Sequence, residues 1–288
     1  MSGDLYLDYA RRGRNAWWRY VLGVVLAVVL VFAIGIGLGV VLNLAHLMPA
    51  DLAQQLTHPS NPAVFFTGTG ATFALFVVAL GLAVLIAHGK RPWDLLGRWN
   101  WRLVGAGFAL WMLAATLAAG VDAVAAPGSI RVTAGPATAT LALFAAIGLG
   151  AQTFAEEYVF RGYITQALML LLKRPWLVAL ISAAVFGSAH IPNGWPQAAG
   201  ATLFGFATAL IAIRLGGVAF TWGLHLANNL FGAVVIVSDQ DVFKGSPGLL
   251  TQNAPQLMWW DVGVEAVLLA IVVALVWRRT ATAAAEVF

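Results

Sequence analysis

Long apolar runs, separated by short polar segments, dominate the chain from residue 21 to residue 277. A helix needs about 20 apolar residues to cross the roughly 30 Å hydrocarbon core of a membrane. By this measure the pattern predicts eight helices, the fourth unusually long and the fifth unusually short. They span residues 21–45, 64–87, 103–121, 137–172, 176–190, 197–213, 216–237 and 259–277. The expected fold is all-α: a polytopic membrane protein with about eight transmembrane helices in one bundle.

The segments between the predicted helices are too short to form a second domain. Within a single membrane domain we distinguish three N-terminal helices (1–136), a core of four helices (137–238), and an outer loop with the last helix (239–288). The first run is longer than the apolar core of a signal peptide, which has about 7–15 residues. We therefore expect this run to remain in the mature protein.

Composition excludes the other broad classes of protein. Hydrophobic residues make up 61% of the 288-residue chain and charged residues 10%, against about 45–50% and about 25% in soluble domains. A soluble protein of this composition would expose large apolar patches and aggregate. Intrinsic disorder needs the opposite balance of hydrophobicity and charge. Because the chain has no cysteine, disulfides and thiolate nucleophiles are excluded as well.

The basic residues predict the orientation, since lysine and arginine concentrate in cytoplasmic loops. Thirteen of the 16 fall in alternate segments, on one side of the eight-helix arrangement: Arg11, Arg12, Arg14, Arg19, Lys90, Arg91, Arg98, Arg102, Lys173, Arg174, Arg214, Arg278 and Arg279. The other side holds Arg131 and Lys244, and Arg161 lies inside a helix. We therefore expect both termini in the cytoplasm, and a lipid bilayer rather than a nucleic acid as the partner of these charges. Thirteen arginines against three lysines are typical of a GC-rich genome, so we expect a bacterial inner membrane.

Ionisable residues inside a membrane helix are costly and indicate function. The fourth predicted helix carries Glu156, Glu157 and Arg161. Glu157 and Arg161 are four residues apart and can pair on one face. Glu156 points about 100° away, so its carboxylate is expected to face His190 and water. We interpret two further acids, Asp261 and Glu265 at the start of the last helix, as interfacial.

Two other helices carry isolated polar groups. His190 ends the fifth predicted helix, and His225 and Asn229 lie four residues apart in the seventh, on one face. At about 1.5 Å per residue, Glu156 lies about 25 Å from the cytoplasmic helix end, His190 about 24 Å and Asn229 about 22 Å. We therefore expect Glu156, His190, His225 and Asn229 to converge on one polar cavity, because separate burial would leave each unsatisfied.

The set Glu156-Glu157-x-x-x-Arg161, Phe186-x-x-x-His190 and His225-x-x-x-Asn229 resembles the motifs of the CPBP family. This family comprises the type II CAAX prenyl proteases and the bacteriocin-processing proteins, also called Abi. Its conserved domain would cover roughly residues 141–237. The resemblance implies an intramembrane endopeptidase that acts on a membrane-associated peptide or protein. It further implies that Glu156 and His190 activate water, that His225 and Asn229 stabilise the oxyanion, and that Glu157 and Arg161 support the site.

The need for a cofactor stays open at this point. The family is filed with metalloproteases, and Glu156, His190 and His225 are an acceptable zinc ligand set. The same residues can also act without metal, with a glutamate-activated water and an oxyanion site. Two other functions compete with proteolysis. Buried carboxylates and histidines also occur in transporters and proton relays, and members of the same family are linked to bacteriocin immunity without catalysis.

Overall fold

Helices account for nearly all of the computed structural model, which describes residues 2–48, 51–56 and 61–285. Within these residues, six helices are long and apolar enough to cross a membrane. They are α2 (Trp17–Leu44), α4 (Pro62–His88), α5 (Trp101–Ala125), the continuous helix Pro136–Leu172, α9 (Trp195–Leu215) and α11 (Met258–Ala285). Large apolar side chains such as Phe32 and Ile36 are exposed on the outside of the bundle, as lipid contact requires. The predicted class, a polytopic helical membrane protein, is confirmed.

The remaining two predicted helices are present but shorter than a full crossing. The fifth is α8 (Pro175–Ser188). The seventh is α10 (Ala219–Leu230), which continues as one π-helical turn, Phe231–Val235. It begins later than residue 216 because Gly216 adopts a left-handed conformation, with φ 79°, and ends α9. It ends before residue 237 because the chain becomes extended there.

Several short elements were not predicted. A helix α1 (Ser2–Ala10) precedes α2, and a single turn α3 (Leu52–Gln55) follows it. Three 3-10 turns occupy Pro92–Leu96, Ile191–Asn193 and Pro255–Leu257. Strands β1 (Ile130–Val132), β2 (Ile236–Ser238) and β3 (Leu250–Gln252) form a sheet of order β1-β3-β2. Strand β3 pairs antiparallel with β1 and parallel with β2. The all-α expectation overlooked this sheet because three residues are too few to show an alternating pattern.

The fourth predicted helix contains a π-helical segment at its centre. It runs as α6 (Pro136–Glu156), the π segment (Glu157–Ile164) and α7 (Thr165–Leu172) without a break. A π segment widens the helix and removes carbonyl oxygens from the regular pattern. The Thr165 hydroxyl donates to the carbonyl of Phe160, and the Tyr6 hydroxyl of α1 donates to that of Arg161. The unpredicted helix α1 thereby supports the helix that carries the acidic pair.

Glycines bring the helices around the future site into close contact. A Cβ on Gly148 of α6 would lie 2.1 Å from the carbonyl oxygen of Phe66 in α4. A Cβ on Gly107 of α5 would lie 2.1 Å from the carbonyl oxygen of Phe220 in α10. Small residues allow such backbone approach in membranes. These two contacts hold α4 against α6 and α5 against α10.

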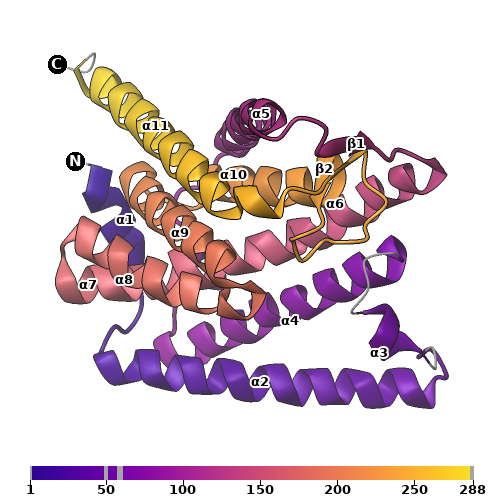
Figure 1. Ribbon diagram of the computed structural model, residues 1–288. Helices are drawn as coiled ribbons and strands as arrows, with labels where there is room; N and C mark the ends of the chain where they lie inside the picture. Colours follow the sequence, from indigo (N-terminus) through magenta and orange to yellow (C-terminus); the bar gives the residue numbers. More distant parts are fainter. Residues whose placement is uncertain (1, 49–50, 57–60, 286–288) are drawn as a thin grey trace.

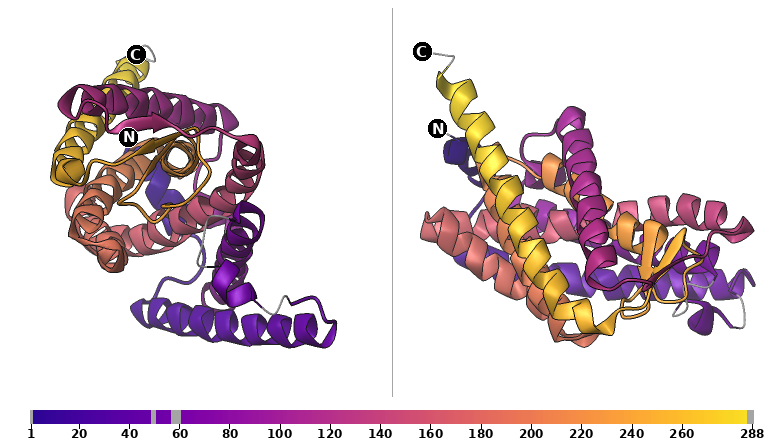
Figure 2. Two further views of the ribbon diagram at one scale, coloured as in Figure 1. Left: turned by 45° about the vertical axis from the view of Figure 1, so that its right-hand side comes forward. Right: turned by 45° about the horizontal axis from the view of Figure 1, so that its top comes forward.

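Both termini lie at one end of the bundle, and the small sheet lies at the other (Figure 1). The right-hand view in Figure 2 shows the same separation. At the end with the termini, α1 packs against α7, α9 and the turn after α4. The hydrogen-bonded pair Gly97–Gly217 joins the start of α5 to the turn between α9 and α10. The segments that carry most basic residues therefore gather at this end. This agrees with the predicted eight helices, because an even number of crossings returns the chain to the side on which it began.

Candidate active site

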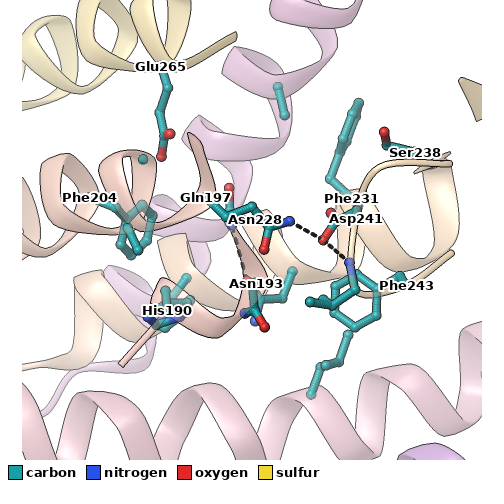
Figure 3. A pocket seen from close by; sticks show the side chains of 18 of the residues that line it. His190, Asn193, Gln197, Phe204, Asn228, Phe231, Ser238, Asp241, Phe243 and Glu265 are labelled. Atoms are coloured by element: carbon teal, nitrogen blue, oxygen red, sulfur yellow. Dashed lines mark hydrogen bonds between the residues drawn. The ribbon is translucent and has the colours of Figure 1, made fainter. Parts of the chain in front are cut away.

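A cavity of about 910 Å³ lies among helices α4, α5, α6, α8, α9, α10 and α11, beneath the loop that follows β2. Its lining includes Glu156, His190, His225 and Asn229, the four residues that the sequence placed in one site. Figure 3 shows part of this wall, with His190 and Asn228 on the same pocket. The geometry around each of the four determines what the cavity can do chemically.

The acidic helix holds a fully buried ion pair beneath the cavity. Nη1 of Arg161 lies 3.2 Å from Oε1 of Glu157, and both side chains have no exposed surface. Nε and Nη2 of Arg161 donate to the Thr208 hydroxyl, at 3.0 Å and 2.6 Å. The guanidinium also lies 4.3 Å from the centre of the Phe186 ring. Glu157 and Arg161 thus form the pair that their spacing predicts, and the contacts from α8 and α9 lock it.

His225 lies between the two adjacent glutamates. Its Nδ1 is 3.0 Å from Oε1 of Glu157, and its Nε2 is 3.3 Å from Oε2 of Glu156. Carboxylates only accept hydrogen bonds, so both contacts are favourable when His225 is doubly protonated or when Glu156 holds a proton. Glu156, which was expected to face His190, therefore has His225 as its histidine neighbour. The reason is that α10 packs directly on α6, whereas α8 ends beyond it.

A chain of amides holds the other oxygen of Glu156. The indole N–H of Trp111 donates to Asn228 (2.9 Å), Asn228 to Asn229 (3.1 Å), Asn229 to Gln152 (2.9 Å) and Gln152 to Oε1 of Glu156 (2.7 Å). An indole can only donate, and a carboxylate can only accept. These two ends fix the direction of all three amides between them. The chain therefore points its donors toward the Glu156 carboxylate.

His190 lies on a separate part of the wall. Its Nδ1 contacts the carbonyl oxygen of Phe186 at 2.8 Å, and its ring packs 4.6 Å from the Phe186 ring. The ring of His225 lies 6.0 Å from Phe186. The Phe186 ring therefore contacts both histidine rings and separates them. The carbonyl contact leaves Nε2 as the ring nitrogen that His190 can offer to the cavity.

Sequence reasoning missed four polar partners of the site: Gln152, Asn228, Trp111 and Thr208. The spacing of Gln152 and Glu156, four residues apart, could have identified the first, because such residues share a helix face. Asn228 could have been found as the immediate neighbour of Asn229. Trp111 and Thr208 lie in otherwise apolar stretches of α5 and α9, so only the packing identifies them.

Four further carboxylates line the cavity. Asp261 and Glu265, interpreted from the sequence as interfacial, face it together with Asp122 of α5 and Asp241 of the outer loop. The interpretation was wrong because the first turns of α11 pack against the bundle rather than facing the membrane surface. Figure 3 shows Glu265 reaching into the pocket from its helix. Burial raises the pKa of the Asp241 carboxyl, and a hydrogen bond from Gln197 at 2.6 Å opposes that rise.

The donors do not fit the zinc site that the family filing would imply. Among the residues that the structure describes, no three histidine, cysteine or acidic side chains are placed to hold a metal ion. Both ring nitrogens of His225 already face carboxylates. His190 stands apart, with Nδ1 on a backbone carbonyl. A zinc ion would need these side chains to rearrange.

The fold and the cavity define a class: a polytopic helical membrane protein with a carboxylate–histidine centre inside the bundle. More particularly, residues 136–231 match the family model described as type II CAAX prenyl endopeptidase Rce1-like. The match covers the segment that holds Glu156, His190, His225 and Asn229, and it confirms the resemblance to the CAAX protease family. The chain is also similar to an uncharacterized protein, YyaK, of Bacillus subtilis (strain 168). Identity is 29% over 271 residues, covering 86% of this chain and 87% of the relative. No solved structure matches the chain.

Proposed function

We propose that the protein is an intramembrane endopeptidase that hydrolyses a peptide bond with a water molecule activated by Glu156. One observation carries the proposal: the Glu156 carboxylate lies on the wall of a large cavity, between His225 at 3.3 Å and the Gln152 amide at 2.7 Å. A carboxylate held in this way can accept a proton from water. The family match supports the same reaction.

The reaction needs no covalent intermediate. Glu156 takes a proton from water, and the water oxygen bonds to the substrate carbonyl carbon. The carbonyl oxygen becomes an oxyanion, for which the second amide proton of Asn229 is a donor. Nε2 of His190 donates as well only when that imidazole carries both protons, because its Nδ1–H faces the carbonyl oxygen of Phe186. His225 joins them once Glu156 holds the proton. The carbon–nitrogen bond then breaks, and Glu156 passes its proton to the leaving amine. Because the donors do not fit a metal ion, no step is assigned to one.

Glu157 and Arg161 act through His225 rather than on the substrate. Their ion pair holds the Nδ1 side of the imidazole, so that Nε2 faces Glu156. A buried partner of this kind fixes the orientation of a histidine ring. These two residues are therefore supporting residues.

The substrate is a peptide or protein associated with the membrane, because the cavity lies inside the bundle. The protein itself is placed in a bacterial inner membrane, with both termini in the cytoplasm. The charge bias supports this orientation, and the bacterial relative supports this type of cell.

Cleavage by the purified protein in detergent tests the proposal. The probe is a mixed-sequence library of fluorescence-quenched decapeptides. The wild-type protein should release fluorescence, and Glu156→Gln should not. Asp8→Asn, which also converts an acid to an amide but lies on the exposed face of α1, should retain the wild-type rate. If Glu156→Gln cleaves the library at the wild-type rate, Glu156 is not the base.

A further inference from the structure

The cavity is built mainly from one end of the helices that it touches. Helix α4 contributes its first half, from Phe65 to Phe76, whereas α5 contributes its second half, from Trp111 to Asp122. Successive helices run in opposite directions, so these halves lie at one end of the bundle. The same holds for α9 and α11, with residues 196–204 and 258–268, whereas the continuous helix Pro136–Leu172 contributes its middle, residues 149–160.

That end is the one with the small sheet, away from both termini (Figure 1). The non-helical part of the lining comes from this end as well: Asn193 before α9, Ser238 and residues 240–243 around β2, and Gln252 of β3. The exposed residues of the lining that lie in loops or turns are Ala189, Asn193 and Val242. The mouth of the cavity therefore opens between the loop after β2 and the turn before α9.

The basic residues mark the opposite end as cytoplasmic. Thirteen of the 16 lysines and arginines belong to the segments at the end with the termini. The described residues that line the cavity include no lysine or arginine. Under the positive-inside rule, the mouth then faces away from the cytoplasm.

We infer that the site receives its substrate from the extracytoplasmic side of the membrane. The substrate class is an exported or membrane-anchored peptide whose scissile bond lies in the outer leaflet or just beyond it. A cytoplasmic peptide would have to pass the end closed by α1, where the Tyr6 side chain is fully buried. This inference rests on the proposed function for its chemistry and on the charge bias for its direction.

Single cysteines test the direction without any substrate, because the natural chain has none. Val242→Cys at the mouth and Ser238→Cys within the lining are compared with Lys173→Cys, an exposed position at the other end. A membrane-impermeant maleimide is applied to spheroplasts of a bacterial host. Positions 242 and 238 should react in intact spheroplasts, and position 173 only after permeabilisation. The reverse pattern, or reaction at 242 without reaction at 238, would overturn the inference.

Vesicles of defined orientation test the route of the substrate. The fluorescence-quenched decapeptide library is added to right-side-out and to inverted membrane vesicles, with Glu156→Gln vesicles as the background. Cleavage should occur in right-side-out vesicles without detergent. Cleavage only in inverted vesicles would overturn the inference and leave the proposed activity intact. If nothing is cleaved even in detergent, the proposed function fails, and the cysteine labelling still decides which face the cavity opens on.

Discussion

Glu156 and Glu157 are neighbours in the chain with different surroundings, and the difference predicts different mutational effects. Glu157 is fully buried against Arg161 and His225. Its replacement by glutamine leaves Arg161 uncompensated, and breaking a buried pair costs roughly 3–5 kcal/mol. Glu156 keeps some exposure, 12% of its side chain, and faces the cavity. We expect Glu157→Gln to lower thermal stability in detergent, and Glu156→Gln to stay folded but lose peptide cleavage.

Melting temperature and cleavage rate, measured on the same preparations, distinguish these outcomes. Asp8→Asn serves as the exposed control. If Glu157→Gln is as stable as the wild type but inactive, while Glu156→Gln still cleaves peptide, the two roles are reversed.

Gln152 connects the amide chain to the candidate base. It donates to Glu156 at 2.7 Å and accepts from Asn229 at 2.9 Å. Gln152→Leu removes both bonds and leaves a carboxylate without its donor. A hydrogen bond to a charged group contributes about 1.5–3 kcal/mol, so we expect kcat/KM to fall about 10- to 100-fold.

The matched control is Gln256→Leu, the same substitution at an exposed position before α11. Both variants are assayed with the peptide library, and their folding is checked by thermal melting. A Gln152→Leu variant with unchanged kcat/KM would show that the amide chain does not affect the base.

At the scale of elements, the crossing of α4 and α6 holds the site in place. Gly148 of α6 touches the backbone of Phe66, and a Cβ there would lie 2.1 Å from a carbonyl oxygen. Gly150, two residues along the same helix, has open space around its missing side chain. Overpacking a close contact costs typically about 1–3 kcal/mol. Gly148→Ala should therefore lower the melting temperature in detergent. Gly150→Ala should not, and an equal loss in both variants would contradict close packing at this crossing.

Much of the helical pattern could be predicted because long apolar runs have few alternatives in a membrane. The predicted run 137–172 agrees with the observed helix to within one residue at its start. The π segment inside it could not be predicted, because the apolar pattern runs through it unchanged and one of its carbonyl oxygens is bonded by Tyr6 from another helix. Helix α1 escaped prediction for a similar reason: its burial is visible only once the bundle end is assembled.

The candidate site was partly predictable for a related reason. A charged or polar group stands out in an apolar helix, which is how Glu156, His190, His225 and Asn229 could be selected. Which of them touch could not be read from depth along the helices alone. Depth placed Glu156 level with His190, but the crossing of α6 and α10 brings it to His225 instead. The catalytic roles of the four residues stay predictions.

At the scale of the whole molecule, Lys90 joins α1 to the rest of the bundle. It was assigned to an exposed cytoplasmic segment, but it is 4% exposed and donates to Gln166 at 2.6 Å. Burial lowers its pKa from 10.5 to about 8. In the unfolded chain Lys90 keeps its proton to higher pH, so the unfolded state binds more protons between these two values. The contribution of Lys90 to stability should therefore increase as the pH rises from about 8 to 10.5.

Thermal melting across this pH range checks the prediction, with Lys90→Met as the comparison. The melting temperature of the wild type, minus that of Lys90→Met, should increase as the pH rises. Lys173→Met, at an exposed lysine of the same end, should show no such trend. If this difference stays constant with pH, the Lys90 ammonium group is in contact with water in the folded protein and its pKa is not lowered by burial.

The charge of the cavity predicts which peptides are cleaved. Five carboxylates line it, those of Asp122, Glu156, Asp241, Asp261 and Glu265, and the described lining holds no lysine or arginine. A cleft of one charge sign with low-dielectric walls concentrates ligands of the opposite sign by about 10-fold or more at low ionic strength. At a pH high enough to ionise these buried carboxylates, decapeptides flanked by lysine should therefore show a higher kcat/KM than the same peptides flanked by glutamate, with glutamine-flanked peptides between them. The preference should shrink toward 1 M salt, where the Debye length is about 3 Å.

Asp241→Asn should reduce this preference for lysine-flanked peptides, and Asp8→Asn should not. Equal rates for all three peptide sets at low salt would show that the carboxylates are protonated in the working enzyme.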